Sequence, residues 1–211
     1  KLELMRSKHD LTHSYLDWGA LNGQVLDGEG KLLLDLWSTF DLTETSFAIP
    51  LDVATTVISE HNRKAKARLR KELRGTEAKG VRVLAGANFF DTYVSHPNVR
   101  EELRAYKGEG ANPGRDDIED VFTFSGWTLE RIDEEYAVRQ PNGTLIRKPA
   151  VNPDEALMIP MGTPFFKRYI APPDTLSEAN RKPENKVFVS TETLAHDKGK
   201  EIHTESNVPP I

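Results

Sequence analysis

The sequence lacks cysteine and long hydrophobic runs. None of its 211 residues is a cysteine, which excludes disulfides, thiolate catalysis and cysteine-ligated zinc and suits a reducing compartment. No apolar run approaches the ~18 residues of a transmembrane helix. No charged-then-apolar signal segment opens the chain. We therefore expect no contact with a membrane.

An excess of positive charge is absent as well. The 28 Lys and Arg residues against 33 Asp and Glu give a formal net charge of -5. This balance argues against a protein that coats nucleic acid with its whole surface, although a local basic face is compatible with it. With 37% hydrophobic and 29% charged residues, the chain is globular and long enough for a core in one or two domains.

The first residues predict a helix. Apolar side chains recur at spacings of seven, four and three, which is typical of one helix face: Leu4, Leu11, Tyr15 and Trp18. Gly19 is suited to end this helix. Because Lys1 already falls inside the pattern, we expect further residues to precede it in the native protein.

Short strands and helices are predicted for the following stretch. Turn residues 27–30 separate two leucine- and valine-bearing arms and predict a hairpin within residues 21–37. Residues 81–85 are typical of a buried strand, and Pro97 is suited to open a helix. Between them we expect a short helix whose aromatic side chains lie in the core: Phe89, Phe90 and Tyr93.

Further strands are predicted in the second half. Residues 121–124 and 127–132 flank a Ser-Gly turn and predict a hairpin. Residues 156–159 form a short apolar run that indicates a buried strand, with residues 165–170 as its expected partner between flanking prolines. Residues 187–189 are a further short candidate.

A long helix between Asp52 and Gly75 carries a concentration of positive charge. Asp52 is suited to cap it, and one apolar face is predicted from Ala54, Ile58, Ala65, Leu69 and Leu73. Between positions 63 and 74 stand one acidic residue and seven basic ones: Arg63, Lys64, Lys66, Arg68, Arg70, Lys71 and Arg74. These basic residues indicate either a solvated face or a contact with nucleic acid or with an acidic neighbouring subunit.

Three groups of acidic residues are candidates for metal ligands or catalysts. An acidic loop (Asp116, Asp117, Glu119 and Asp120) lacks the ligand alternation and central glycine of a calcium-binding EF-hand. The trio Asp133, Glu134 and Glu135 offers carboxylates for glycoside hydrolysis but no partner that would raise a pKa. On a strand at residues 200–206, one face carries Glu201, His203 and Glu205, with His196 as a possible fourth metal ligand. A hydrated strand face shows the same alternation, so we expect no metal site.

Four sequence blocks follow one another in a recognisable order. They are VLAGANFFDTYVSHPNVR (83–100), FTFSGWTLE (122–130), IPMGTPFFKRYIAPPD (159–174) and GKEIHTESNVPPI (199–211). With the hairpin at residues 23–41, this ordered set resembles the major capsid proteins of lambda-like tailed phages and prophages, the phage capsid protein E family. The resemblance covers nearly all of the chain.

The resemblance implies an α+β fold of the HK97 capsid type, truncated at the N-terminus. Residues 1–46 would form a peripheral domain from the end of a spine helix and a hairpin. Residues 47–195 would form an axial domain, and residues 196–211 a strand returning to the peripheral domain. Family members also carry an N-terminal arm and an extended loop that clasp neighbours. Because the chain lacks that region, we expect it to fold alone without closing a shell.

The implied function is structural and requires no catalytic residue, metal or cofactor. Copies of the chain in pentamers and hexamers would enclose packaged double-stranded DNA, held non-specifically. Scaffold, portal and decoration proteins are the implied further partners. The implied location is the virion capsid, with the bacterial host cytoplasm during assembly. Two alternatives stay open: a nanocompartment shell protein of the same fold, and a metal-dependent hydrolase using the acidic and histidine face of residues 200–206.

Overall fold

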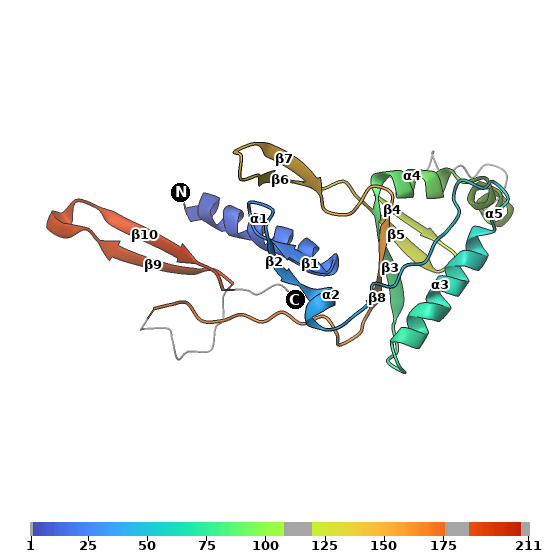
Figure 1. Cartoon of the computed structure of the whole chain (residues 1–211), viewed down its shortest axis with the longest axis horizontal. Coiled ribbons are helices and arrows are strands. Elements are labelled where there is room, and N and C mark those ends of the chain that lie inside the picture. The colour runs from blue at the N-terminus through green and yellow to red at the C-terminus, as the bar shows by residue number, and fades with distance from the viewer. Residues whose placement is uncertain (1, 108–119, 176–185, 208–211) are drawn as a thin grey trace. The chain divides into compact units, whose positions relative to one another are not determined.

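The computed structural model describes residues 2–107, 120–175 and 186–207 (Figure 1). Two compact units make up the chain. Residues 1–40 and 166–211 form the first unit, and residues 41–165 form the second. Both combine helices with small sheets, which confirms the predicted α+β class.

The second unit is built around the largest sheet. It contains four strands in the order β4 (Val121–Phe124), β5 (Trp127–Ile132), β3 (Gly80–Gly86) and β8 (Ala156–Met161). β3 lies parallel to β5, whereas the other two pairs are antiparallel. The predicted strand at residues 81–85, the hairpin at 121–132 and the strand at 156–159 are thus all present.

Three helices accompany this sheet. They are α3 (Ile58–Glu72), α4 (Ala87–Ser95) and α5 (Pro97–Lys107). Figure 1 shows α3 and α5 beside the sheet, with α4 across its end. Because β3 and β5 are parallel, the chain must return to the starting end of the sheet between them, and β4, which is antiparallel to β5, makes that return.

Aromatic rings fill the core between helices and sheet. Tyr93 is fully buried, and its ring stacks at 11° on Trp127 with the centroids 6.2 Å apart. The Tyr93 ring also meets Phe122 and Phe124 edge to face. Asn62 Nδ2 donates to the Tyr93 hydroxyl at 2.6 Å, and burial raises the pKa of that hydroxyl. The expected aromatic core is therefore confirmed.

The long basic helix begins later than predicted. Asp52 lies in a turn rather than at the cap, and α3 starts at Ile58 after Val57, which makes no side-chain cap. Asn98 of α5 supplies the missing acceptor, because its Oδ1 accepts the Ile58 backbone N–H at 2.9 Å. A capping residue forty positions away gives no local signal.

The predicted strand partner of β8 was wrong. Residues 165–170 pair with no strand, and β8 instead pairs antiparallel with β3, with Ala156 opposite Ala85. Pro164 interrupts the chain directly before Phe165, which is 54% exposed. An additional hairpin consists of β6 (Glu135–Arg139) and β7 (Leu145–Pro149), with a turn at residues 140–143 between them.

The first unit contains one long helix and two hairpins. In chain order its elements are α1 (Leu2–Leu21), β1 (Gln24–Leu26), β2 (Leu32–Asp35), α2 (Leu36–Thr39), β9 (Phe188–Thr193), the 3-10 turn η1 (Ala195–Asp197) and β10 (Lys200–Glu205). β1 pairs with β2, and β9 with β10. Gly23 reverses the chain after α1 at φ +80, where a Cβ would lie 2.1 Å from the Trp37 ring.

The contacts of α1 differ from the predicted apolar stripe. Leu4 and Leu11 are each 62% exposed, whereas His13 is buried. His9 Nε2 lies 3.1 Å from Thr204 Oγ1, and His13 Nε2 lies 2.7 Å from the Ser206 hydroxyl. Residues near the two ends of the sequence thus lie together, as expected, but polar side chains join them.

The two units also differ from the expected domain boundaries. The first boundary falls at residue 41 rather than 47, and the second at 166 rather than 196. Residues 188–193 belong to the first unit because β9 pairs with β10 along its whole length.

The aromatic core generates a stability test. Phe90 is 3% exposed within the core, whereas Phe165 is 54% exposed. We expect Phe90→Ala to lower the free energy of unfolding by about 3 to 5 kcal/mol, because it leaves a cavity. The same truncation at Phe165 is expected to cost less than about 0.5 kcal/mol. Urea unfolding followed by Trp fluorescence measures both, and equal effects would show that Phe90 does not carry the core.

Candidate functional site

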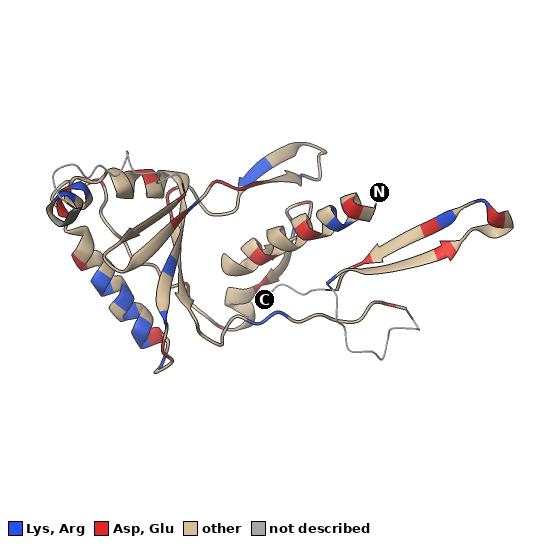
Figure 2. Cartoon of the chain, turned by 180° about the vertical axis from the view of Figure 1, so that it is seen from behind, with Lys and Arg blue, Asp and Glu red and all other residues tan. Residues whose placement is uncertain are grey.

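A basic face on α3 is the strongest concentration of one charge. Six of the seven predicted residues are exposed, and Lys66 is half-buried: Arg63, Lys64, Lys66, Arg68, Arg70, Lys71 and Arg74. The opposite side of the helix carries the buried residues Ile58, Asn62 and Ala65. Figure 2 shows basic residues along most of the length of α3.

Three of these cations are engaged within the chain. Lys64 Nζ pairs with Glu60 at 2.8 Å, one turn away, and Glu60 keeps a lowered pKa mainly through that hydrogen bond. Lys66 Nζ donates to the Gly126 carbonyl oxygen at 3.3 Å. Arg68 Nη1 donates to the Ser46 carbonyl oxygen at 2.9 Å. These contacts bind α3 to its own unit.

The remaining four cations point away from such contacts. Within the described residues, the side chains of Arg63, Arg70, Lys71 and Arg74 make no hydrogen bond or ion pair. Arg63, Arg70 and Lys71 share the exposed side of α3, and Arg74 follows directly after the end of the helix. This set, called here the free basic face, is available to a negatively charged partner.

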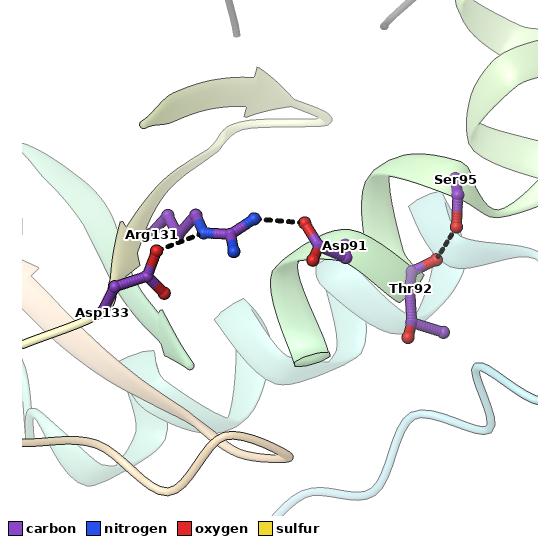
Figure 3. Close-up of polar contacts among 5 residues, drawn as sticks. All are labelled: Asp91, Thr92, Ser95, Arg131 and Asp133. Carbon is purple, nitrogen blue, oxygen red and sulfur yellow. Dashed lines mark hydrogen bonds and ion pairs between the residues drawn. The ribbon is translucent and has the colours of Figure 1, made fainter. Parts of the chain in front are cut away.

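A second charged group joins α4 to the sheet. Arg131 of β5 lies between two carboxylates (Figure 3): its Nη1 pairs with Asp91 of α4 at 2.5 Å and its Nε with Asp133 at 2.7 Å. The hydrogen bond to Asp133 is the main cause of the raised Arg131 pKa. The positive charge of Arg131 is thus paired with two negative charges, and the contact with Asp91 joins β5 to α4. We call Arg131, Asp91 and Asp133 the Arg131 clasp.

The acidic trio after β5 is occupied by similar neighbours. Asp133 binds Arg131, and Glu134 accepts from the Tyr136 hydroxyl at 3.1 Å. Glu135 lies 3.6 Å from Arg147 across the hairpin. Each carboxylate therefore has a donor or a cation beside it.

The strand with the candidate metal ligands is β10. Glu201 and His203 are exposed and alternate with half-buried Ile202 and Thr204, as the sequence predicted. Glu205 accepts from the Asp174 backbone N–H at 3.0 Å and from Asn207 Nδ2 at 2.6 Å. The backbone donor is the larger cause of its lowered pKa.

No group of three or more acidic or histidine side chains stands ready to hold a metal ion in the parts of the chain that the structure describes. The predicted fourth ligand, His196, lies in η1 with φ 60. The acidic loop weighed for calcium lies outside the described residues, except Asp120, whose carbonyl accepts the Arg131 backbone N–H.

His13 of α1 lies against Ser206, just after the end of β10. His13 is buried, and this burial is the main cause of its lowered pKa, with the nearby Arg168 guanidinium as the second cause. Arg168 itself pairs with Asp17 of α1. These polar contacts hold the extended residues after 166 within the first unit.

Apolar side chains remain exposed on both units. Three consecutive leucines of β2 are exposed by 37 to 60%: Leu32, Leu33 and Leu34. Phe40, Leu145 and Tyr169 are each more than 60% exposed. Within the described residues, no helix is both long and apolar enough to cross a membrane. Exposed leucines that lie next to one another form a surface that suits a protein partner.

Sequence reasoning found the basic face but missed two other features. The sequence predicted only that the β2 leucines belong to a hairpin. Their exposure in the structure makes them a candidate contact surface. The Arg131 clasp joins residues forty positions apart in sequence. Nothing in the sequence of β5 indicated that Arg131 would contact a carboxylate of α4.

The α+β fold with open hairpins, charged faces and exposed leucines is typical of a structural protein that forms interfaces. Comparison with known proteins identifies the family. The model of the family "Phage major capsid protein E" matches residues 1–211. The chain belongs to this family of phage major capsid proteins, which confirms the resemblance seen in the sequence.

A curated relative agrees with the family. The "Major capsid protein" of Salmonella phage Felix O1 (isolate Felix O1-VT1) is 30% identical to this chain over 108 residues. The matched segment covers 50% of this chain and 29% of the Felix O1 protein. This chain therefore matches under a third of that relative's length.

The Arg131 clasp can be tested against a matched ion pair. Arg131 is 26% exposed and contacts two carboxylates, whereas Arg147 is 83% exposed and lies 3.6 Å from one. We expect Arg131→Leu to lower the free energy of unfolding by about 1 kcal/mol and Arg147→Leu to change it little, because exposed pairs are screened by solvent. Chemical denaturation of both variants measures this. Equal effects would assign the clasp no special role.

Proposed function

We propose that this chain is part of the major head subunit of a tailed phage or prophage and that its copies tile a closed shell around double-stranded DNA. The observation that carries the proposal is the match of the capsid family over residues 1–211. Members of such a family act by repeated contacts between copies, so the exposed faces are the functional parts.

We further propose an HK97-type subunit, with the first unit as its peripheral domain and the second as its axial domain. Two observations support this assignment. The first unit is assembled from both ends of the sequence, and the second is inserted between them. The second also has its own sheet and aromatic core, as an inserted domain requires.

The exposed leucines support self-association. Leu33 of β2 is 60% exposed in a two-stranded sheet. β1 packs against α1, and Val25 is 1% exposed, so this sheet is supported on one side. Neighbouring subunits in a shell of pentamers and hexamers would cover the side that carries Leu33. Scaffold, portal and decoration proteins are further proposed partners of the assembled head.

The proposal is tested by electron microscopy of the full-length protein expressed with its neighbouring phage genes. We expect closed, DNA-filled particles. Leu33→Asp is expected to abolish them while leaving a folded subunit, because it places a charge on a surface that must be buried. Gly28→Asp adds the same charge in the preceding turn, where a new Cβ meets nothing within 4 Å, and should leave assembly intact.

Three outcomes have distinct meanings. Shells that hold protein cargo instead of DNA would identify a nanocompartment. Complete absence of particles from the unmodified protein would contradict a shell function. Assembly of Leu33→Asp at the normal yield would remove the leucine surface from the contacts between subunits.

A further inference from the structure

We infer that the free basic face of α3 in one copy binds an acidic face on the hairpin of β9 and β10 in a neighbouring copy. This inference rests on the proposed shell function, because it names one contact between copies. The acidic face is defined by Ser190 and Glu192 of β9 and by Glu201 and His203 of β10, which are all exposed.

The strand register places two like charges directly opposite each other. Glu201 pairs with Glu192, and His203 pairs with Ser190 on the same side of the hairpin. Figure 2 shows acidic residues on both strands. Neither glutamate side chain forms an ion pair or hydrogen bond with another described residue. Directly opposed like charges weaken strand pairing, so a cation from outside the hairpin would stabilise it.

The other face of the hairpin is already in use. Thr204 alternates with the acidic side chains and contacts His9 of α1 at 3.1 Å. At the base of the acidic face, Glu205 is satisfied by Asp174 and Asn207. The uncompensated charge is therefore confined to the Glu192 and Glu201 pair, on the side turned away from α1.

The free basic face has the complementary properties. Its four cations lack partners in the described residues, and exposed Ala67 lies among them on the same side of α3. A small residue there leaves room for a hairpin to approach between longer cationic side chains. Arginine also suits carboxylates because its planar fork can donate two parallel hydrogen bonds.

A contact of this kind satisfies two charge imbalances together. DNA phosphates would neutralise α3 but would leave the opposed glutamates without a counter-ion, so the hairpin of a second copy fits the observations better. The two faces are different surfaces, which makes the contact head-to-tail. Repetition of a head-to-tail contact generates rings when the rotation closes, as a shell of repeated rings requires.

Cross-linking between singly substituted chains tests the contact, and residues 1–211 contain no cysteine that would compete for the cross-linker. Full-length protein carrying Ala67→Cys is mixed with protein carrying Ser190→Cys, co-assembled, and treated with a short bis-maleimide. We expect a cross-linked dimer. Thr191→Cys is the matched control, because Thr191 is equally exposed but lies on the opposite face of the hairpin. Its yield with Ala67→Cys should be at least fivefold lower.

Charge exchange supplies a second readout. The variants Glu192→Lys/Glu201→Lys and Arg70→Glu/Arg74→Glu are each expected to lower the cross-linking yield at least tenfold. We expect the cross-linking yield to recover when the two charge-reversed proteins are mixed. In that mixture the Glu192→Lys/Glu201→Lys protein carries Ser190→Cys, and the Arg70→Glu/Arg74→Glu protein carries Ala67→Cys. Failure of the mixture to recover would overturn the inference. Loss of DNA retention by Arg70→Glu/Arg74→Glu with unchanged cross-linking would assign the face to DNA.

The result also separates this inference from the function on which it rests. Particles seen by electron microscopy without the Ala67 to Ser190 cross-link would refute the contact and leave the shell function standing. A cross-link in small oligomers, with no particles from the unmodified protein, would support the contact and refute the shell.

Discussion

A two-stranded sheet cannot shield both of its faces from water, and this constraint explains why apolar side chains stay exposed on the hairpins of this chain. In the described residues, every sheet except β4-β5-β3-β8 consists of two strands. Each two-stranded sheet exposes apolar side chains, including Leu33 in β2, Leu145 in β7 and Val189 in β9. Such hairpins are marginal in isolation. They become favourable when neighbouring molecules cover them, which is the ordinary condition of a subunit within a capsid.

The second unit carries one of these hairpins, β6 with β7, beside a packed core. Its core is complete in itself, because Tyr93, Phe90 and Leu129 are buried between helices and sheet. The Arg131 clasp fixes α4 against that sheet from the outside. A stable unit of this kind can hold interfaces in position while the contacts themselves form only on assembly. This division between a packed core and uncovered edges is consistent with the capsid family to which the chain belongs.

Local patterns predicted the elements well and their partners poorly. The hairpin of β4 and β5 was placed correctly because alternating residues and a Ser-Gly turn act within a dozen positions. The start of α3 was wrong because its cap comes from Asn98, and residues 165–170 were wrong because pairing depends on a distant strand. For the candidate site, the sequence predicted the basic residues. It could not show which are free, because that depends on carbonyl oxygens at Ser46 and Gly126.

The central claim is that assembly covers the exposed hairpins while leaving the core of the second unit unchanged. Hydrogen–deuterium exchange, compared between free subunits and assembled particles, measures this directly. The account predicts strong additional protection of backbone amides in the hairpins of β1 with β2 and of β9 with β10. The amides of β3 should exchange slowly in both states. Particles in which these hairpins exchange as fast as in free subunits would contradict the account.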